Sequence, residues 1–365
     1  MGVTRLEIDL NALKHNHTYL KSKLAKNVKM MAVVKAFGYG SDACEVALFL
    51  EELGVDYFAV AYANEGEVLR KAGIQAPILV LHPQPDNFHT IIEQCLEPSL
   101  YSPRVFKEFS AFAKAKQQQN YPVHLKFNTG LNRLGFWEND TEWILERLKE
   151  TNAIKVASVF SHLAASEDAK EKTFTQNQIT SFTKTAQILL KTLPYTPFLH
   201  QSNTSAIINY PEAQFDMVRT GIGLYGYGNT PEEDQNLRPV ASLKSVISQI
   251  HKIEPGETVG YNRAYKASHY EKTATIPIGH ADGISRAYGH GKGYITIHGK
   301  KAPIIGNVCM DMLMVNITDI DCKEGDDVII FGEGVSAVDV SATIDSISYE
   351  LLTAVSQRIK RVILR

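Results

Sequence analysis

The chain has 365 residues, of which 44% are hydrophobic and 21% charged, and its formal net charge is −2. This length and composition predict a folded protein with a large core and two domains. The small net charge gives no electrostatic reason to expect nucleic acid or a membrane surface as a partner, so a small molecule is the expected ligand class.

The sequence leads us to expect neither export nor membrane insertion. The opening residues, MGVTRLEIDLNAL, lack a long apolar core, and no later run approaches the roughly 18–20 apolar residues of a spanning helix. The cysteines lie far apart and form no C-x-x-C pair, which fits reduced thiols rather than a structural metal. They are Cys44, Cys95, Cys309 and Cys322. We therefore expect a cytoplasmic protein without a metal site.

Residues 8–235 alternate short apolar runs with longer amphipathic stretches, as repeated βα units do. The runs are VKMMAVV (28–34), YFAVA (57–61), APILVL (76–81), EPSLY (97–101), VHLKF (123–127), IKVASVF (154–160), PFLHQS (197–202) and DMVRT (216–220). Between them lie helix-like stretches such as SDACEVALFLEELG (41–54), in which Gly54 suits the C-terminal cap. Eight such pairs predict an α/β fold with a closed (β/α)8 barrel of the TIM type.

Residues 236–365 predict a second, β-rich domain. Its β-branched runs are TATIPIG, GYITIHG, APIIGNV, MLMVNIT and DDVIIFG, separated by glycine and turn residues. Only IDSISYELLTAVSQ (344–357) is predicted to be helical there. Residues 1–7 are candidates to pair with this domain.

Polar side chains follow several of the predicted barrel strands, where barrel enzymes carry their chemistry. They are Lys35, Lys126, Asn128, His162, Ser202, Asn203 and Arg219. A single lysine at a strand end more often reaches to water than reacts. Several cations on one rim require anionic partners, however, because burying unpaired charge is costly. Carboxylates or a bound phosphate must supply that charge.

The stretch RTGIGLYGYG (219–228) contains G-x-G-x-x-G, which raises the alternative of a dinucleotide-binding oxidoreductase. A dinucleotide fingerprint should open a helix, whereas this one leads into a loop after the eighth strand. In barrels, the loops after the last two strands commonly bind phosphate through backbone N–H groups. A phosphate site beside a reactive lysine indicates pyridoxal phosphate, whose aldehyde forms a Schiff base with lysine. The spacing alone leaves Lys35 and Lys126 as alternative candidates, with Arg219 facing the pyridine nitrogen.

Ten separated motifs resemble those of the alanine racemase family over essentially the full length of the chain. In order they are IDLNAL, AVVKAFGYG, KFNTGLNRLGF, SHLAASE, SNTSA, VRTGIGLYG, VGYNRAY, IPIGHADG, GNVCMDM and SYELLTAVSQR. The resemblance implies a fold-type III enzyme that uses pyridoxal phosphate to interconvert L- and D-alanine and supplies D-alanine for peptidoglycan. It also implies a homodimer with shared active sites. Some motifs are similar to racemase domains fused behind a cell-wall peptide ligase.

The resemblance assigns a role to individual residues. Lys35 resembles the Schiff-base lysine and one catalytic base, and Tyr261, from the partner subunit, resembles the other. Cofactor ligands implied in the same way are Tyr39, Arg133, His162, Asn203, Thr204, Arg219, Gly221, Ile222 and Tyr225. Arg133, Met310 and Asp311 resemble substrate-binding residues, and Lys126 resembles the lysine that is carbamylated in many members. Two bases on opposite sides of the cofactor explain racemisation, since one removes the α-proton and the other returns one on the opposite face.

Four positions depart from the family pattern. Asn128 replaces an aspartate near Lys126, which leaves a carbamate, an unmodified lysine or a bound anion as ways to balance Arg133. Thr204 replaces a serine, and His280 and Gln357 replace two tyrosines at the substrate entrance. Fewer phenols there predict tolerance of side chains larger than that of alanine, serine first. The remaining alternatives are this broader amino acid racemase and a non-catalytic barrel that carries pyridoxal phosphate, which would lack a second domain.

Overall fold

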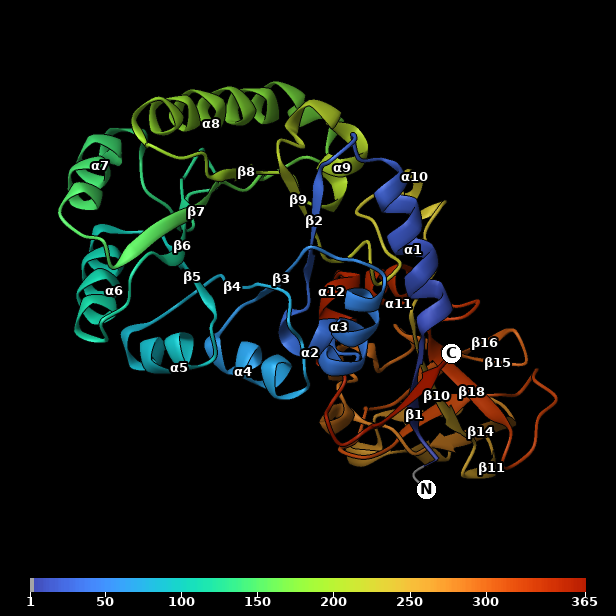
Figure 1. Ribbon diagram of the computed structural model, residues 1–365. Coiled ribbons are helices and arrows are strands. Elements are labelled where there is room, and N and C mark those ends of the chain that lie inside the picture. The colour runs from blue at the N-terminus through green and yellow to red at the C-terminus, as the bar shows by residue number, and fades with distance from the viewer. Residues whose placement is uncertain (1–2) are drawn as a thin grey trace. The chain divides into compact units, whose positions relative to one another are not determined.

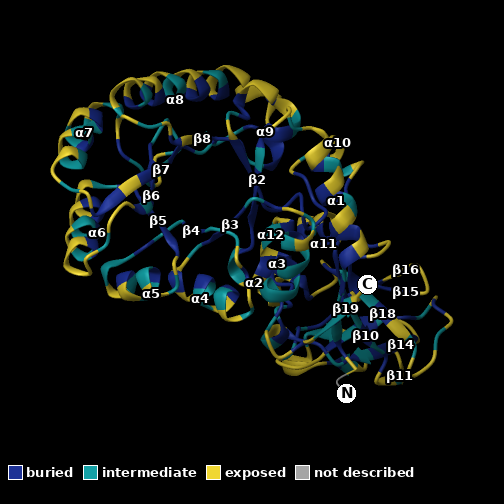
Figure 2. Cartoon of the chain, viewed as in Figure 1, coloured by how far each residue is buried: buried dark blue, intermediate teal, exposed yellow. Residues whose placement is uncertain are grey.

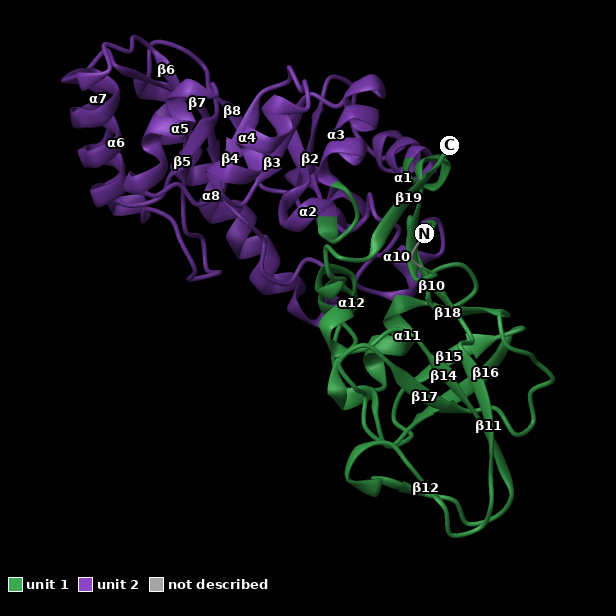
Figure 3. Cartoon of the chain, turned by 90° about the horizontal axis from the view of Figure 1, so that it is seen from below, with its two compact units in different colours: residues 1–13, 39–42, 238–365 green, residues 14–38, 43–237 purple. Residues whose placement is uncertain are grey.

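The computed structural model describes residues 3–365 (Figure 1). The chain divides into two compact units, which Figure 3 colours separately. The barrel unit contains residues 14–38 and 43–237, and the β unit contains the described residues up to 13 together with 39–42 and 238–365. The units thus differ from the contiguous ranges 8–235 and 236–365, because residues 8–13 and 39–42 group with the C-terminal part of the chain.

The barrel unit holds a closed parallel barrel of eight strands, which confirms the predicted fold class. Its strands are β2 (Lys29–Val33), β3 (Tyr57–Val60), β4 (Ile78–Val80), β5 (Glu97–Leu100), β6 (Tyr121–Lys126), β7 (Ile154–Phe160), β8 (Phe198–His200) and β9 (Met217–Thr220). The barrel closes between its first and last strands, where Met31 lies opposite Arg219. The carboxyl ends of β2 and β9, which carry two of the predicted site residues, are therefore neighbours.

Helices surround the barrel strands, and their buried residues lie on the side that faces the strands (Figures 1 and 2). They are α3 (Ala43–Glu52), α4 (Ala63–Lys71), α5 (Phe88–Glu93), α6 (Pro103–Ala115), α7 (Thr141–Lys149), α8 (Lys172–Thr192), α9 (Thr204–Asn209) and α10 (Pro231–Asp234), and α1 (Leu10–Ser22) precedes β2. In α3, Val46 and Leu50 are buried, and Gly54 with φ +79° follows the helix as the sequence predicts. The Ser102 hydroxyl caps α6 by accepting from the Val105 N–H.

The β unit is built on a nine-stranded sheet in the order β11-β14-β17-β16-β15-β18-β10-β1-β19. Its strands are β1 (Arg5–Asp9), β10 (Ala241–Val246), β11 (Gln249–Ile253), β14 (Glu271–Ile276), β15 (Tyr294–Ile297), β16 (Lys300–Ile305), β17 (Leu313–Asn316), β18 (Asp327–Phe331) and β19 (Lys360–Leu364), with β12 (Thr258–Val259) and β13 (Tyr265–Lys266) as a separate pair. The N-terminal β1 runs antiparallel to β10 and parallel to β19, so both ends of the chain enter one sheet.

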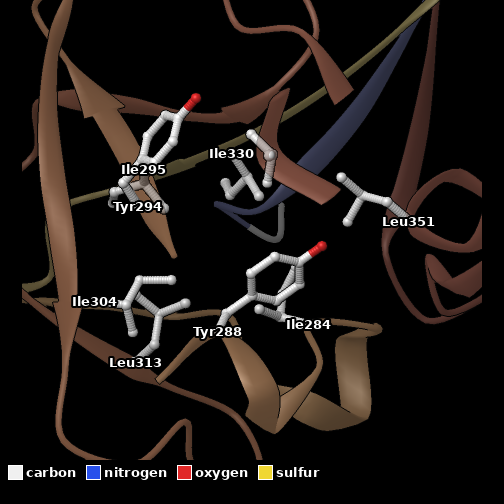
Figure 4. Close-up of a pocket in the computed structure, with 9 residues that line it drawn as sticks. Ile284, Tyr288, Tyr294, Ile295, Ile304, Leu313, Ile330 and Leu351 are labelled. Atoms are coloured by element: carbon white, nitrogen blue, oxygen red, sulfur yellow. The ribbon is translucent and has the colours of Figure 1, made fainter. Parts of the chain in front are cut away.

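Residues 238–365 form two α-helices, not one. The predicted α12 (Ser348–Ala354) is present, but α11 (Ala337–Ala342) also forms, and the expectation of a single helix was wrong. With six residues, α11 is too short to show a helical period in the sequence, although Ser336 caps it by accepting from the Val338 N–H. A cavity of about 10 Å³ lies in the core of the β unit between Tyr288, Leu313 and Leu351 (Figure 4). It has room for about one water molecule, so it is a packing gap and not a ligand site.

Within residues 3–365, no helix is long and apolar enough to cross a bilayer.

Candidate active site

Lys35 follows strand β2 and begins a left-handed turn, α2 (Lys35–Tyr39). The turn residues Ala36, Phe37, Gly38 and Tyr39 all have φ between +53° and +64°. Such a conformation costs a residue other than glycine about 1–2 kcal/mol, so surrounding contacts must hold the turn. Backbone strain of this kind concentrates at functional sites.

Glu65 supplies part of that hold. Its carboxylate accepts from the Ala36 N–H at 2.6 Å and, through the other oxygen, from the N–H groups of Ala61 at 2.7 Å and Tyr62 at 3.1 Å. One side chain thus caps α4 and fixes the backbone directly after Lys35. Glu65 was not among the predicted site residues, because its only local signal in the sequence is its place in the first turn of a helix.

Four basic side chains of the barrel unit lie near His162, namely Lys35, Lys126, Arg133 and Arg219. Burial and the charge of Arg133 lower the pKa of Lys35, with Glu65 acting in the opposite sense. Burial, followed by Arg133, Arg219 and Lys35, lowers the pKa of Lys126 to about 8. Burial and the same cations hold the pKa of His162 well below its usual range, which makes it a neutral imidazole. These side chains therefore influence one another's protonation within the barrel unit.

No carboxylate of residues 3–365 is in direct ion-pair contact with these cations. In the described part of the chain, no ion pair joins Lys35, Lys126, Arg133 or Arg219 to an acidic side chain. Arg219 is 5% exposed, and burial lowers its pKa to about 9, which leaves it charged at neutral pH. Its guanidinium donates to His200 Nδ1 at 2.6 Å and to His162 Nδ1 at 3.1 Å, and to carbonyl oxygens. An anionic ligand would complete such a site.

The glycine stretch after β9 forms a tight turn beside this cluster. The N–H groups of Leu224 and Tyr225 donate back to the carbonyls of Gly221 and Ile222, so the turn does not open a long helix. The Gly223 N–H points to Thr204 Oγ1 at 3.4 Å, and a side chain at Gly223 would meet Thr204 at 2.5 Å. The turn therefore needs glycine for its close approach, and the dinucleotide reading lacks the helix it requires.

Tyr225 connects the glycine turn to the strand of the lysine. Its ring is buried, and its hydroxyl donates to the Val33 carbonyl at 3.3 Å, two residues before Lys35. The sequence-predicted phosphate residues Thr204, Gly221, Ile222 and Tyr225 thus share one end of the barrel with Lys35.

Two asparagines are committed to local structure. The Asn203 side chain caps α9 by accepting from the Ala206 N–H at 2.9 Å, and it also accepts from the Ser166 hydroxyl. Asn128 Oδ1 accepts from the N–H groups of Gly130 and Asn132, and its amide donates to the Asn132 side chain. Asn128 thus closes a turn, and an aspartate could accept the same two N–H bonds.

Tyr39 groups with the β unit. It is 8% exposed, and its ring centroid lies 6.1 Å from that of Tyr349 on α12. Burial, with the nearby Tyr349, raises the pKa of its hydroxyl. Arg361 holds the adjoining segment by donating to the carbonyls of Gly40 and Ser41.

The other predicted site residues of the β unit lie at its surface. Tyr261 is 75% exposed and Met310 59% exposed. Asp311 accepts from Arg358 at 2.7 Å, and the same guanidinium donates to the buried Asp282 at 2.7 Å. Arg358 therefore orients Asp311, which the sequence analysis did not foresee.

The two entrance positions lie in the same part of the β unit. His280 and Gln357 are both exposed. The Ala281 N–H donates to the Met310 carbonyl, and the Ser356 N–H donates to the Asp282 carbonyl. These bonds connect the turn that carries His280, the loop of Met310 and the segment that carries Gln357.

Comparison with known proteins identifies the family. The model "Alanine racemase, N-terminal domain" matches residues 8–229, and "Alanine racemase, C-terminal domain" matches residues 240–363. An alanine racemase of Halothermothrix orenii is 35% identical, with 98% of this chain and 96% of the relative covered.

Solved structures agree with the family models. An alanine racemase of Clostridium difficile 630 superposes with a TM-score of 0.93 at 35% identity, covering 100% of this chain and 96% of that one. The Bacillus anthracis alanine racemase with bound L-Ala-P gives 0.90 at 30% identity, with 100% and 96% covered. With both family models matched along nearly its whole length, the chain belongs to the alanine racemase family.

Proposed function

We propose that this protein is a cytoplasmic, pyridoxal-phosphate-dependent racemase that interconverts L- and D-alanine and provides D-alanine for peptidoglycan. The observation that carries the proposal is the set of barrel cations without carboxylate partners, beside a turn that only glycine fits. The cofactor's phosphate and phenolic oxygen are anions of the kind this site needs.

The residues fit the cofactor group by group. Lys35 would hold its aldehyde carbon, and Arg219 would donate to its pyridine nitrogen. Arg133 would contact the phenolic oxygen, Lys126 would position Arg133, and the neutral His162 would lie against the ring. The phosphate ligands would be Tyr39, Asn203, Thr204, Gly221, Ile222 and Tyr225. Bound pyridoxal phosphate supplies an electron-withdrawing ring that stabilises negative charge on the substrate's α-carbon.

Two side chains would move the proton. The lowered pKa of Lys35 favours its neutral amine, which is the form that accepts an α-proton. The Tyr261 hydroxyl would exchange a proton on the opposite face, while Arg133, Met310 and Asp311 would orient the substrate. Arg219 cannot release a proton to the pyridine nitrogen at reasonable cost, which keeps the ring a moderate electron acceptor. A weaker electron acceptor would favour return of the proton to the α-carbon over side reactions.

A homodimer would complete the site. Three large side chains are exposed on the β unit: Tyr261 (75%), Met310 (59%) and Met312 (47%). Aromatic and methionine side chains are enriched at protein–protein interfaces. We propose that a second copy of the chain covers them, so that Tyr261 faces the Lys35 of its partner. The decisive test of the function is exchange of the alanine α-proton with solvent deuterium, together with conversion between enantiomers. Absence of both in the cofactor-loaded dimer would refute it.

Lys126 is expected to carry a carbamate. Its pKa of about 8 makes a substantial share of the amine neutral near pH 8, and only the neutral amine adds carbon dioxide. The added negative charge would offset Arg133 and Arg219. At fixed ¹³CO₂ pressure, the carbamate carbon resonance should grow between pH 7 and pH 9.

The resonance should vanish in the Lys126→Ala variant. It should remain in the Lys29→Ala control, because Lys29 is already paired with Asp56, whose carboxylate lies 3.4 Å from the Lys29 ammonium in the wild type. If the wild type gave no carbamate signal, Lys126 would be unmodified, or a bound anion would balance Arg133 instead. Racemase activity that depends on the chloride concentration would indicate the bound anion.

Serine is the expected second substrate. His280 and Gln357 present no phenol at the entrance, and both are exposed. We expect kcat/KM for serine to lie within about tenfold of that for alanine, since a pocket without a steric stop discriminates weakly against one hydroxyl. His280→Tyr should lower the serine value more than the alanine value. Undetectable serine turnover would contradict this prediction.

A further inference from the structure

A row of polar side chains crosses the inside of the barrel, where branched apolar residues normally pack. Five consecutive strands, β5 to β9, each contribute one member. They are Glu97, His124, Ser158, His200 and Arg219, and none is more than 9% exposed. A buried polar row is costly unless every member is satisfied, so its contacts must be complete.

The five side chains form an unbroken series of contacts. Arg219 Nη1 lies 2.6 Å from His200 Nδ1, and His200 Nε2 lies 2.8 Å from Ser158 Oγ. Ser158 Oγ lies 2.5 Å from His124 Nδ1, and His124 Nε2 lies 2.7 Å from Glu97 Oε2. Each imidazole uses both ring nitrogens, and Ser158 joins the two.

Chemistry fixes the direction of donation along this row. A guanidinium has no acceptor, so His200 Nδ1 accepts and the His200 proton is on Nε2, which donates to Ser158. The Ser158 oxygen accepts that hydrogen bond, so its single O–H is free to donate, and His124 Nδ1 accepts from it. The His124 proton is therefore on Nε2 and is donated to Glu97. Every donor points away from the cation and toward the carboxylate.

We propose that Glu97 is the remote counterion of Arg219, connected to it by this directed row, and that Glu97, His124, Ser158 and His200 are positioning residues for the guanidinium. Because Arg219 is assigned to the cofactor's pyridine nitrogen, the catalytic consequence rests on the proposed function. Aligned donors polarise one another, so the carboxylate stabilises a cation it does not touch. Without the row, the buried guanidinium would have carbonyl and imidazole acceptors but no opposing charge.

Neighbouring groups support this arrangement. The Phe160 ring stacks on His200 with centroids 4.8 Å apart and a 2° interplanar angle, which holds the imidazole in one plane. Burial, followed by Arg219 and His124, holds the pKa of His200 well below its usual range, as a neutral acceptor requires. Burial and the charge of Glu97 raise the pKa of Tyr57, which hydrogen-bonds the same carboxylate.

The tautomers of the two imidazoles test the row directly, in the full chain with and without pyridoxal phosphate. Nitrogen-15 NMR of histidine-labelled protein should find His124 and His200 protonated on Nε2 alone. Ser158→Ala should shift the ring-nitrogen resonances of both His124 and His200. Ser99→Ala removes a hydroxyl that is equally buried, on β5, but has no hydrogen-bond partner, so it should shift neither. A proton on Nδ1 of either ring, or two protons on either ring, would overturn the proposal, and the wild type alone can give that result.

A double-mutant cycle tests the coupling to Arg219. Ser158→Ala and Glu97→Gln should each lower kcat/KM for alanine about tenfold, and the double variant should lose no more than either alone, because both cut one row. Ser99→Ala should keep kcat/KM for alanine within about twofold of the wild-type value. Its effect should be additive with that of Glu97→Gln. If the losses of kcat/KM caused by Ser158→Ala and Glu97→Gln were additive in free energy, the proposed coupling of Glu97 to Arg219 would be rejected. Should alanine prove not to be a substrate, the proposed function fails while the tautomers still decide the row.

Discussion

Lys35→Ala should abolish racemisation and the visible absorption of lysine-bound pyridoxal phosphate. The side chain is the amine at the end of β2, and its lowered pKa, set by burial and Arg133, favours the nucleophilic form. Loss of both the covalent anchor and one proton carrier should lower kcat at least about 10³-fold. Absorbance spectra of the purified variant and an alanine racemisation assay measure the two effects.

Lys29→Ala is the matched control for this variant. Lys29 begins the same strand, but its side chain is 37% exposed and it lies 3.4 Å from Asp56. Loss of an exposed ion pair costs about 0–1 kcal/mol, so spectrum and activity should be unchanged. A Lys35→Ala enzyme that retains the lysine-bound absorption would transfer the role to Lys126, the other lysine of the cluster.

The barrel could be predicted because each strand leaves a local signal. Parallel strands buried on both sides read as short apolar runs, and all eight runs became barrel strands. Even the short, polar EPSLY became β5, where Glu97 points its charge into the polar row. Barrel geometry then placed Lys35 and Arg219 at one end without any knowledge of side-chain contacts.

The contacts that complete the site could not be predicted in this way. Glu65 lies 29 residues from the Ala36 N–H it accepts, and Glu97 reaches Arg219 only through three other strands. Nothing in the local pattern distinguishes these carboxylates from surface ones. The grouping of residues 39–42 with the β unit likewise depends on Arg361, more than 300 positions away.

Tyr261→Phe should keep the lysine-bound absorption and lose racemisation. Tyr261 belongs to the β unit, where it is 75% exposed, so removing its hydroxyl should not disturb folding. Loss of one of two proton carriers should lower kcat about 10²–10⁴-fold. Because Lys35 remains on the other face, α-proton exchange should persist for one enantiomer only. Tyr270→Phe, at another exposed tyrosine of this unit, should behave as wild type.

Mixing the two inactive variants tests the shared site. If each site combines Lys35 of one subunit with Tyr261 of the other, a dimer of Lys35→Ala with Tyr261→Phe has one intact site and one doubly altered site. Random exchange in an equal mixture makes half of the dimers mixed, so activity should recover to about a quarter of wild type. Recovery requires subunit exchange, which a size-tagged subunit can follow. Complete exchange without recovery would mean that both bases come from one chain.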